Sequence, residues 1–154
     1  MGSGRYLRMT EIEIWEFIAS QRVMRLATVG ADGDPHVVPM WYAVLEKQLG
    51  MRSASDARAK VGNLLRTGRF ATVIDTGGEY SELRGVMLKG RAYAADEATS
   101  DRIIAGFGER YYGGAQDLSK LPEPVQEKLE GLTFTYVVLE PEKIVSWDNS
   151  KWVE

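Results

Sequence analysis

The hydrophobic residues near the start of the chain recur with the period of a helix. In the stretch MTEIEIWEFIASQ, Ile14, Phe17 and Ile18 fall on one face, with Trp15 on its flank, as in an amphipathic helix. Thr10 is followed three residues later by Glu13, the spacing of a capping box at a helix N-terminus. The pattern therefore predicts a helix that begins after Thr10 and ends near Gln21.

Beyond this helix the pattern changes to extended segments separated by short polar connections. Three of them are rich in β-branched and aromatic residues, namely VMRLATV, HVVPMWYAVL and LGMRSA. Short connections between such segments are typical of an antiparallel meander. Pro39 lies inside the second segment and cannot donate to a ladder, so we expect it at a sheet edge, at a bulge, or where its backbone faces something other than a strand.

The second half of the chain alternates between both periods. A helix is expected over residues 56–67, with Val61, Leu64 and Leu65 facing inward. The later elements are expected to be the strands RFATVIDT, LRGVMLKGRAYAA and LTFTYVVLEPEKIVSW and the helices DEATSDRIIAGFGERYYGG and EPVQEKLEG. Gly85 and Gly90 lie inside the long middle strand, where glycine usually marks the bends or bulges that barrels need to close. Six or seven strands with three or four peripheral helices predict a closed or partly closed antiparallel barrel.

Composition narrows the chemistry that this barrel can perform. The chain of 154 residues has 19 Lys and Arg against 22 Asp and Glu, so it has no overall basic surface for nucleic acid. It has no cysteine, and its only histidine, His36, cannot supply a multi-imidazole metal site. We expect His36 to be structural, and we expect no metal site and no catalytic acid–base pair. No apolar run is long enough to span a membrane and no secretory pattern is present, which predicts a cytoplasmic protein.

One helix entrance gathers hydroxyl groups and cations. Ser53 and Ser55 precede the helix, and Arg58 and Lys60 lie in its first turns. A helix N-terminus with such neighbours can bind a phosphate. Asn63 can either bond an oxygen of that ligand or fasten the helix to a neighbouring loop. The alternative is a solvated charged face, which Asp56 favours because its carboxylate would repel a phosphate.

The order of these segments resembles a known superfamily. The run PHVVPMWY, the strand MRSAS, the helix RAKVGNLLR, the strand RFATVID, and the later EYSELRGVMLKGRA and VVLEPEKIVSWD resemble the pyridoxamine 5'-phosphate oxidase-like split β-barrels, which bind FMN or the deazaflavin coenzyme F-420. The similarity is greatest to the branch of flavin- and deazaflavin-dependent oxidoreductases, and it extends from Thr10 to Asp148. It implies a six- to seven-stranded antiparallel split β-barrel that forms a homodimer, with two cofactor sites at the subunit interface. Residues 1–9 would be a cloning remnant or a flexible N-terminus, and residues 10–154 a single domain.

The resemblance also implies roles for particular residues. The cofactor phosphate or phosphodiester would be held by Ser53, Ser55, Arg58 and Lys60, with Asn63 in support. The strand beneath the tricyclic ring would contain Val38, Pro39, Met40 and Trp41. The segment from Met40 to Tyr42 is equally compatible with ordinary core or dimer interface, because aromatic residues are enriched in both. Trp147 and Trp152 would either pack at the chain end or cap a partner's site.

The function implied is hydride transfer between bound F-420 and a flat, electron-poor organic substrate. The run RAKxxNLxR is more similar to the deazaflavin-binding branch, which favours F-420 over FMN, and an FMN-dependent oxidase or reductase is the alternative. The chain ends in SWDNSKWVE instead of the Arg-Leu-x-Pro type tail of the true pyridoxamine 5'-phosphate oxidases, so we do not expect oxidation of vitamin B6. A non-catalytic carrier or sensor, and a nucleic-acid-binding barrel, are the other hypotheses; the net negative charge counts against the last.

Overall fold

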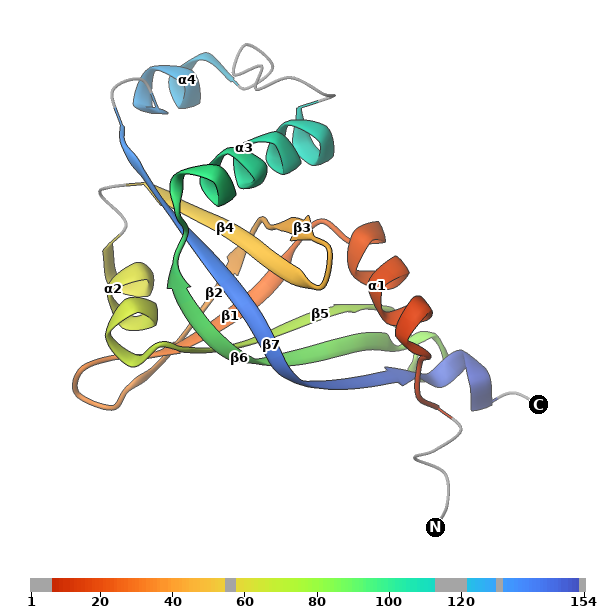
Figure 1. The fold of residues 1–154 in the computed structure, drawn as a ribbon. Coiled ribbons are helices and arrows are strands. Elements are labelled where there is room, and N and C mark those ends of the chain that lie inside the picture. The colour runs from red at the N-terminus through yellow and green to blue at the C-terminus, as the bar shows by residue number, and fades with distance from the viewer. Residues whose placement is uncertain (1–6, 55–57, 113–121, 130–131, 153–154) are drawn as a thin grey trace.

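The computed structural model describes residues 7–54, 58–112, 122–129 and 132–152 (Figure 1). Its α-helices are α1 (Glu11–Ser20), α2 (Arg58–Thr67), α3 (Glu97–Tyr111) and α4 (Glu123–Leu129). Its strands are β1 (Met24–Val29), β2 (Pro35–Met40), β3 (Ala43–Leu45), β4 (Gln48–Ala54), β5 (Arg69–Thr76), β6 (Arg84–Ala94) and β7 (Phe134–Asp148). Short 3-10 helices cover Tyr80–Glu82 and Asn149–Trp152.

Helix α1 begins at the predicted capping box. The backbone N–H of Glu13 donates to the Thr10 hydroxyl at 3.2 Å, and the backbone N–H of Thr10 donates to the Glu13 carboxylate at 2.7 Å. These two bonds satisfy N–H groups that the first turn of a helix leaves without partners. The helix lies beside the strands on the right of Figure 1 and buries Phe17 and Ile18.

The seven strands form one curled antiparallel sheet in the order β2-β1-β5-β6-β7-β4-β3, which confirms the predicted mainly β split barrel with peripheral helices (Figure 1). The predicted meander was wrong. β1–β2 and β3–β4 are hairpins, but β2 and β3 lie at opposite edges of the sheet. The run HVVPMWYAVL is therefore two strands, and the chain crosses between the two edges through Trp41 and Tyr42.

Glycine supplies one of the bends in the long strands. The pairing of β6 with β7 shifts in register between Lys89 and Gly90. A methyl group on Gly90 would overlap the carbonyl oxygen of Glu140 on the neighbouring strand. This close approach of two backbones is the bulge that the interior glycine predicted.

The core occupies the inside of the curled sheet. Leu26, Leu88, Met51 and Leu64 are fully buried there and come from both halves of the chain. Leu65 is 43% exposed, so the prediction that it faces inward was wrong. It follows Leu64 by about 100° around the helix, which takes it off the buried face.

The packed domain starts before the first helix. Met9 is 8% exposed and belongs to the core, and its backbone N–H donates to the Ser146 hydroxyl at 3.0 Å. The N–H of Asp148 donates to the carbonyl of Leu7 at 2.6 Å. Residues 7–9 are thus tied to the end of β7, ahead of the boundary placed at Thr10 from the sequence.

Candidate functional site

Helix α2 lies between the end of β4 and the hairpin of β1 and β2 (left of Figure 1). Leu64 fixes the helix to the barrel because its side chain is fully buried in the core. The helix ends at Gly68, which has a φ of +65° and whose N–H donates to the carbonyl of Leu64 at 2.8 Å. A left-handed glycine after the last turn is a common helix stop, so the sequence itself determines the length of α2.

Two of the predicted anion ligands lie at the start of this helix. Ser53, near the end of β4, is 4% exposed, and Lys60 is half-buried on α2. Lys60 makes no hydrogen bond or ion pair with the residues that the structure describes. Arg58 is the first residue of α2, but its side chain lies outside the described part of the chain, as does all of Ser55.

Two other cations of this region, Arg66 and Arg69, have structural partners. Arg66 donates to the carbonyl of Val29, at the end of β1. Arg69 forms an ion pair with Glu142. These contacts separate Lys60 from the basic residues around it, which the sequence alone treats alike.

Asn63 fastens α2 to the barrel. Its side-chain amide donates to the hydroxyl of Thr28 at 3.1 Å, and Thr28 is 5% exposed. The sequence suggested a neighbouring loop as the alternative partner of Asn63, whereas the structure shows a bond to strand β1. Thr28 was not identified from the sequence, where it is one polar residue inside an apolar strand.

The four residues of the predicted ring-binding strand do not share one face. Val38 and Met40 are half-buried against the core, whereas Pro39 is exposed on the opposite face of β2. Trp41 has left the strand and stacks on Tyr111, with ring centroids 4.1 Å apart and an interplanar angle of 3°. The adjacent Tyr42 is fully buried.

Tyr42 and Arg110 complete the C-terminal end of α1. The Tyr42 hydroxyl donates to the carbonyl of Ile18 at 2.6 Å and to that of Gln21 at 3.0 Å. The Arg110 guanidinium donates to the carbonyls of Ala19 at 3.0 Å and Gln21 at 2.5 Å, and lies over the Tyr42 ring at 4.5 Å. A helix leaves its last carbonyls without partners, and here residues distant in sequence supply the donors. Burial raises the pKa of Tyr42 to about 12.

The outer face of the sheet is apolar along one row. The register aligns, from β2 to β7, the residues Pro39, Arg25, Val73, Met87 and Val145. Val37 and Val29 lie near this row on the same face and are 67% and 50% exposed. Such an apolar sheet face on a small domain is typical of a surface that another chain covers.

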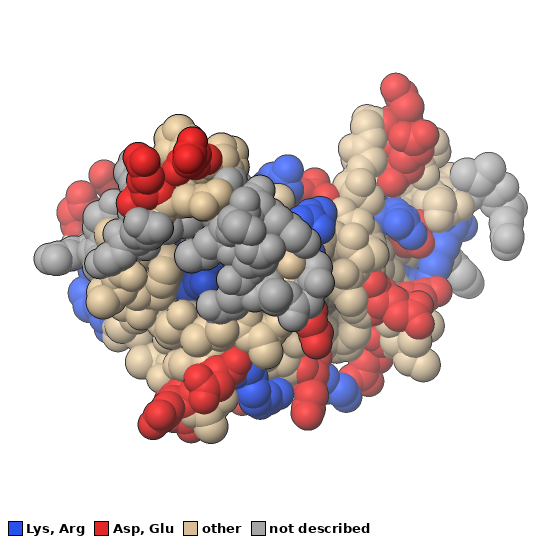
Figure 2. All heavy atoms as spheres, turned by 90° about the horizontal axis from the view of Figure 1, so that it is seen from above, with Lys and Arg blue, Asp and Glu red and all other residues tan. Residues whose placement is uncertain are grey.

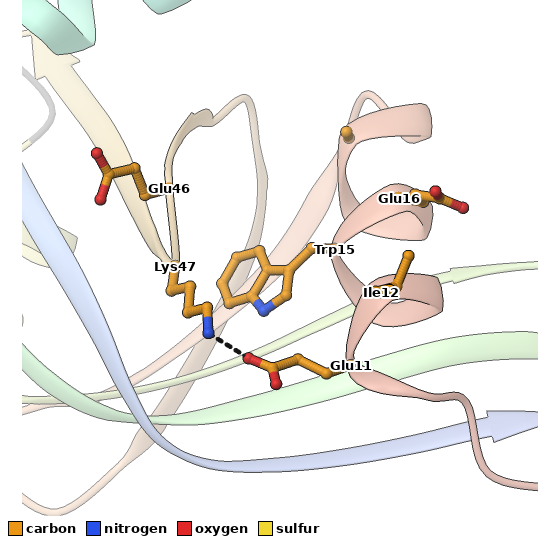
Figure 3. A pocket seen from close by; sticks show the side chains of 7 residues that line it. Glu11, Ile12, Trp15, Glu16, Glu46 and Lys47 are labelled. Atoms are coloured by element: carbon orange, nitrogen blue, oxygen red, sulfur yellow. Dashed lines mark ion pairs between the residues drawn. The ribbon is translucent and has the colours of Figure 1, made fainter.

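A separate groove of about 600 Å³ lies between α1 and the turn that joins β3 to β4 (Figure 3). The indole of Trp15 occupies the space between the two elements, and Lys47 pairs with Glu11 at 2.5 Å. The groove is open and lies on the opposite side of the barrel from α2 (Figure 1). It contains no histidine or cysteine, and among its described lining residues only the Glu11–Lys47 pair is joined by an ion pair.

Charged side chains of both signs are mixed on the described surface seen from above in Figure 2. His36 is exposed on the edge strand β2. Within the described residues, no group of three or more His, Asp or Glu side chains is arranged to hold a metal ion. In the same part of the chain, none of the helices has the length and apolar character needed to cross a membrane.

This fold, with a helix N-terminus at the end of a barrel strand, is that of a split β-barrel protein. The chain belongs to the pyridoxamine 5'-phosphate oxidase family, whose model matches residues 10–148. No match is found among curated proteins.

Solved structures show the same architecture. A conserved hypothetical protein from Mycobacterium tuberculosis is 31% identical, with a TM-score of 0.80 over 95% of this chain and 89% of that one. The heme storage protein of Vibrio cholerae is 21% identical, with a TM-score of 0.68 over 89% of this chain and 94% of that one. A FAD-binding protein from Mycobacterium smegmatis is 16% identical, with a TM-score of 0.61 over 92% of this chain and 95% of that one.

Proposed function

We propose that this protein is an oxidoreductase that transfers a hydride between a bound deazaflavin, coenzyme F-420, and a flat, electron-poor organic substrate. The observation that carries the proposal is Lys60, a half-buried cation on the first turns of α2 that has no partner among the described residues. A half-buried ammonium loses part of its hydration, so an anionic ligand at this position compensates that loss. The resemblance to the family, whose model matches residues 10–148, implies a cofactor phosphate at the N-terminus of α2.

The residues around α2 fit the anionic tail of such a cofactor. Ser53 contributes a hydroxyl from the end of β4, and the N-terminal N–H groups of α2 add a partial positive charge. In this proposal Ser55 and Arg58 are the remaining ligands of the cofactor phosphate. In the same proposal Val38 and Met40 of β2 support the ring together with Trp41 beyond the end of the strand, whereas Pro39 lies on the opposite face of β2 and its side chain belongs to the outer face of the sheet.

The bound cofactor supplies the hydride chemistry, and the chain positions it and excludes water. No side chain is assigned to catalysis. The half-buried apolar residues Val38, Met40 and Trp41 favour flat hydrophobic substrates over small charged ones.

A flavin is the second candidate for the cofactor. The relatives from Mycobacterium smegmatis and Mesorhizobium loti are described as FAD-binding proteins, and FMN or FAD presents the same combination of anionic tail and flat ring. A carrier or storage protein without turnover is the third candidate, because the similar protein from Vibrio cholerae is described as a heme storage protein.

We also propose that the protein acts as a homodimer through the outer face of the sheet. The apolar row from Pro39 to Val145 supports this assignment, because monomeric proteins rarely leave such a face open to water. Arg25 and Asp75 form an ion pair at 2.8 Å on this face, so the contact between two copies would include a polar centre.

Titration of the purified protein with F-420 and with FMN tests the cofactor assignment. Lys60→Ala should weaken binding by about tenfold to a hundredfold, which corresponds to about 1.5–3 kcal/mol for a charge-assisted contact. Arg91→Ala is the matched control, because Arg91 is an exposed cation that pairs with Glu140 at 3.5 Å. Equal affinities of the two variants for the cofactor would mean that Lys60 does not bind it and belongs to a solvated charged helix face.

Stopped-flow oxidation of the reduced, protein-bound cofactor tests the reaction. A panel of enones and other conjugated acceptors should oxidise reduced F-420, with similar rates from about pH 6 to 8 because no catalytic acid–base pair is assigned. Rapid oxidation by dissolved oxygen alone would indicate a flavin oxidase. A large loss of rate in His36→Ala, with cofactor binding retained, would show that His36 takes part in the reaction.

A further inference from the structure

We infer that Thr28 and Asn63 form a positioning pair that sets the orientation of α2 and thereby the cofactor affinity of the site. This inference rests on the proposed function, because the affinity in question is that for F-420 or a flavin. It changes the role of Asn63 from a ligand of the cofactor to a residue that acts through the helix.

The first step is the environment of the pair. The Asn63 amide donates to the Thr28 hydroxyl at 3.1 Å, and Thr28 is 5% exposed on the inner side of β1. One residue further along β1, the carbonyl of Val29 accepts a hydrogen bond from Arg66. Successive residues of one strand therefore hold residues from successive turns of α2.

The second step is what this contact adds to the apolar packing. Leu64 is buried in the core and Val61 packs against the same core, but these apolar contacts are not directional and leave room for a small rotation of the helix about its axis. Asn63 is adjacent to Leu64 in sequence and therefore lies about 100° from it around the helix. A directional hydrogen bond at this angle prevents the rotation, since rotation would leave the buried Thr28 hydroxyl without its partner.

The third step connects the rotation to the cation. Lys60 precedes Asn63 by three residues and Leu64 by four, so all three lie on neighbouring positions of one helix surface. A rotation that breaks the Asn63–Thr28 bond therefore also moves Lys60 around the helix axis, because both side chains belong to one rigid helix. The polar pair and the anion-binding cation are thus mechanically coupled through one rigid turn.

A double-mutant cycle tests the coupling, with F-420 and FMN as the probes. Asn63→Ala and Thr28→Val should each weaken cofactor binding about three- to tenfold, and the double variant should be no weaker than either single variant. Thr28→Ser keeps the hydroxyl and should bind as the parent does. Leu65→Ala, an exposed position on the same helix, is the control for a general effect on α2.

Three results would count against the inference or its foundation. If Asn63→Ala weakens binding while Thr28→Val does not, Asn63 contacts the cofactor directly. If neither change affects binding, the pair is only structural. A parent protein that binds neither F-420 nor FMN overturns the proposed function. Hydrogen exchange then shows separately whether the pair orders α2. Faster exchange of the backbone amides of α2 in Asn63→Ala and Thr28→Val, but not in Leu65→Ala, supports the positioning role.

Discussion

Replacing Tyr42 by phenylalanine should destabilise the fold through the end of a helix that is distant in sequence. Tyr42 is fully buried, and its hydroxyl donates to the carbonyls of Ile18 and Gln21. Phenylalanine fills the same space without the donor. The carbonyl of Gln21 keeps the bond from Arg110, but that of Ile18 loses its side-chain partner.

The magnitude follows from this difference between the two carbonyls. A buried polar group left without a partner costs about 1–3 kcal/mol. For a chain of 154 residues, each kcal/mol lowers Tm by about 2–4 °C, so Tm should fall by about 2–12 °C. The loss should lie at the lower end if water reaches the Ile18 carbonyl and at the upper end if the site stays dry.

Urea unfolding followed by circular dichroism, at one fixed protein concentration, measures the effect. The midpoint should fall while the slope with urea stays constant, because the surface exposed on unfolding is nearly the same. Tyr80→Phe is the control, since Tyr80 is 70% exposed. If the two variants are equally stable, the Tyr42 hydroxyl does not hold the end of α1.

The pH dependence of stability offers a second test of the role of Tyr42. The pKa of Tyr42 is raised to about 12 in the folded state, above the ordinary value of 10.0. Ionisation is therefore easier in the unfolded chain, so the contribution of Tyr42 to stability is complete below pH 10 and is lost as the pH rises toward 12. Tyr42→Phe should reduce this alkaline loss, whereas Tyr80→Phe should leave the part due to Tyr42 intact.

Three further changes test other features of the fold. Gly90→Ala should destabilise the protein by at least about 2 kcal/mol in urea unfolding, because the added methyl group would overlap the backbone of Glu140. Gly62→Ala on α2 is the matched variant: a methyl group there meets nothing within 4 Å, so this change should stabilise the protein by about 0.5–1 kcal/mol. Met87→Glu, in the middle of the apolar row, should shift the proposed homodimer to a monomer of 17.2 kDa in light scattering, whereas Ile12→Glu on α1 should leave the mass of the parent protein unchanged. The Asp96 carboxylate accepts a hydrogen bond from Thr99 at the start of α3, which lowers the pKa of Asp96 from 3.8. The contribution of Asp96 to stability is therefore present above pH 3.8 and is lost as the pH falls through the lowered pKa. Asp96→Asn should make the urea midpoint depend less on pH in this range, and Asp101→Asn should not.

Much of the fold could be predicted because it depends on local patterns. The capping box of Thr10 and Glu13 marks the start of α1, and RFATVIDT is β5 residue for residue. The interior Gly90 indicates the bulge. Each of these signals is complete within a few consecutive residues, so no long-range contact is needed to interpret it.

The order of the strands could not be predicted in the same way. Alternation indicates that a segment is extended but not which strand it pairs with, and therefore HVVPMWYAVL is compatible with a single strand in a meander. The chain instead turns at Trp41 and Tyr42, whose side chains pack against Tyr111 and the end of α1. Those partners are distant in sequence, so the turn is determined by tertiary contacts.

The same distinction explains what the sequence missed at the candidate site. In the sequence, three positively charged residues of this region look alike: Lys60, Arg66 and Arg69. Their partners in the structure distinguish them, because Arg66 bonds the carbonyl of Val29 and Arg69 pairs with Glu142, whereas Lys60 has no partner among the described residues. A cation that already has a partner must give it up to bind a ligand, whereas Lys60 has no such bond with any residue that the structure describes.

Two of the helices that pack against the barrel strands, α1 and α2, are held in place by polar residues from other parts of the chain. Tyr42 and Arg110 supply donors to the last carbonyls of α1, and Thr28 accepts from the middle of α2. Hydrophobic burial holds each helix against the barrel but is not directional, whereas a hydrogen bond requires one angle and one distance. Apolar packing therefore accounts for the presence of the two helices, and the polar contacts for their orientation. For the proposed site, whose ligands would lie on the first turns of α2, we therefore expect the orientation of this helix to affect the affinity for the cofactor.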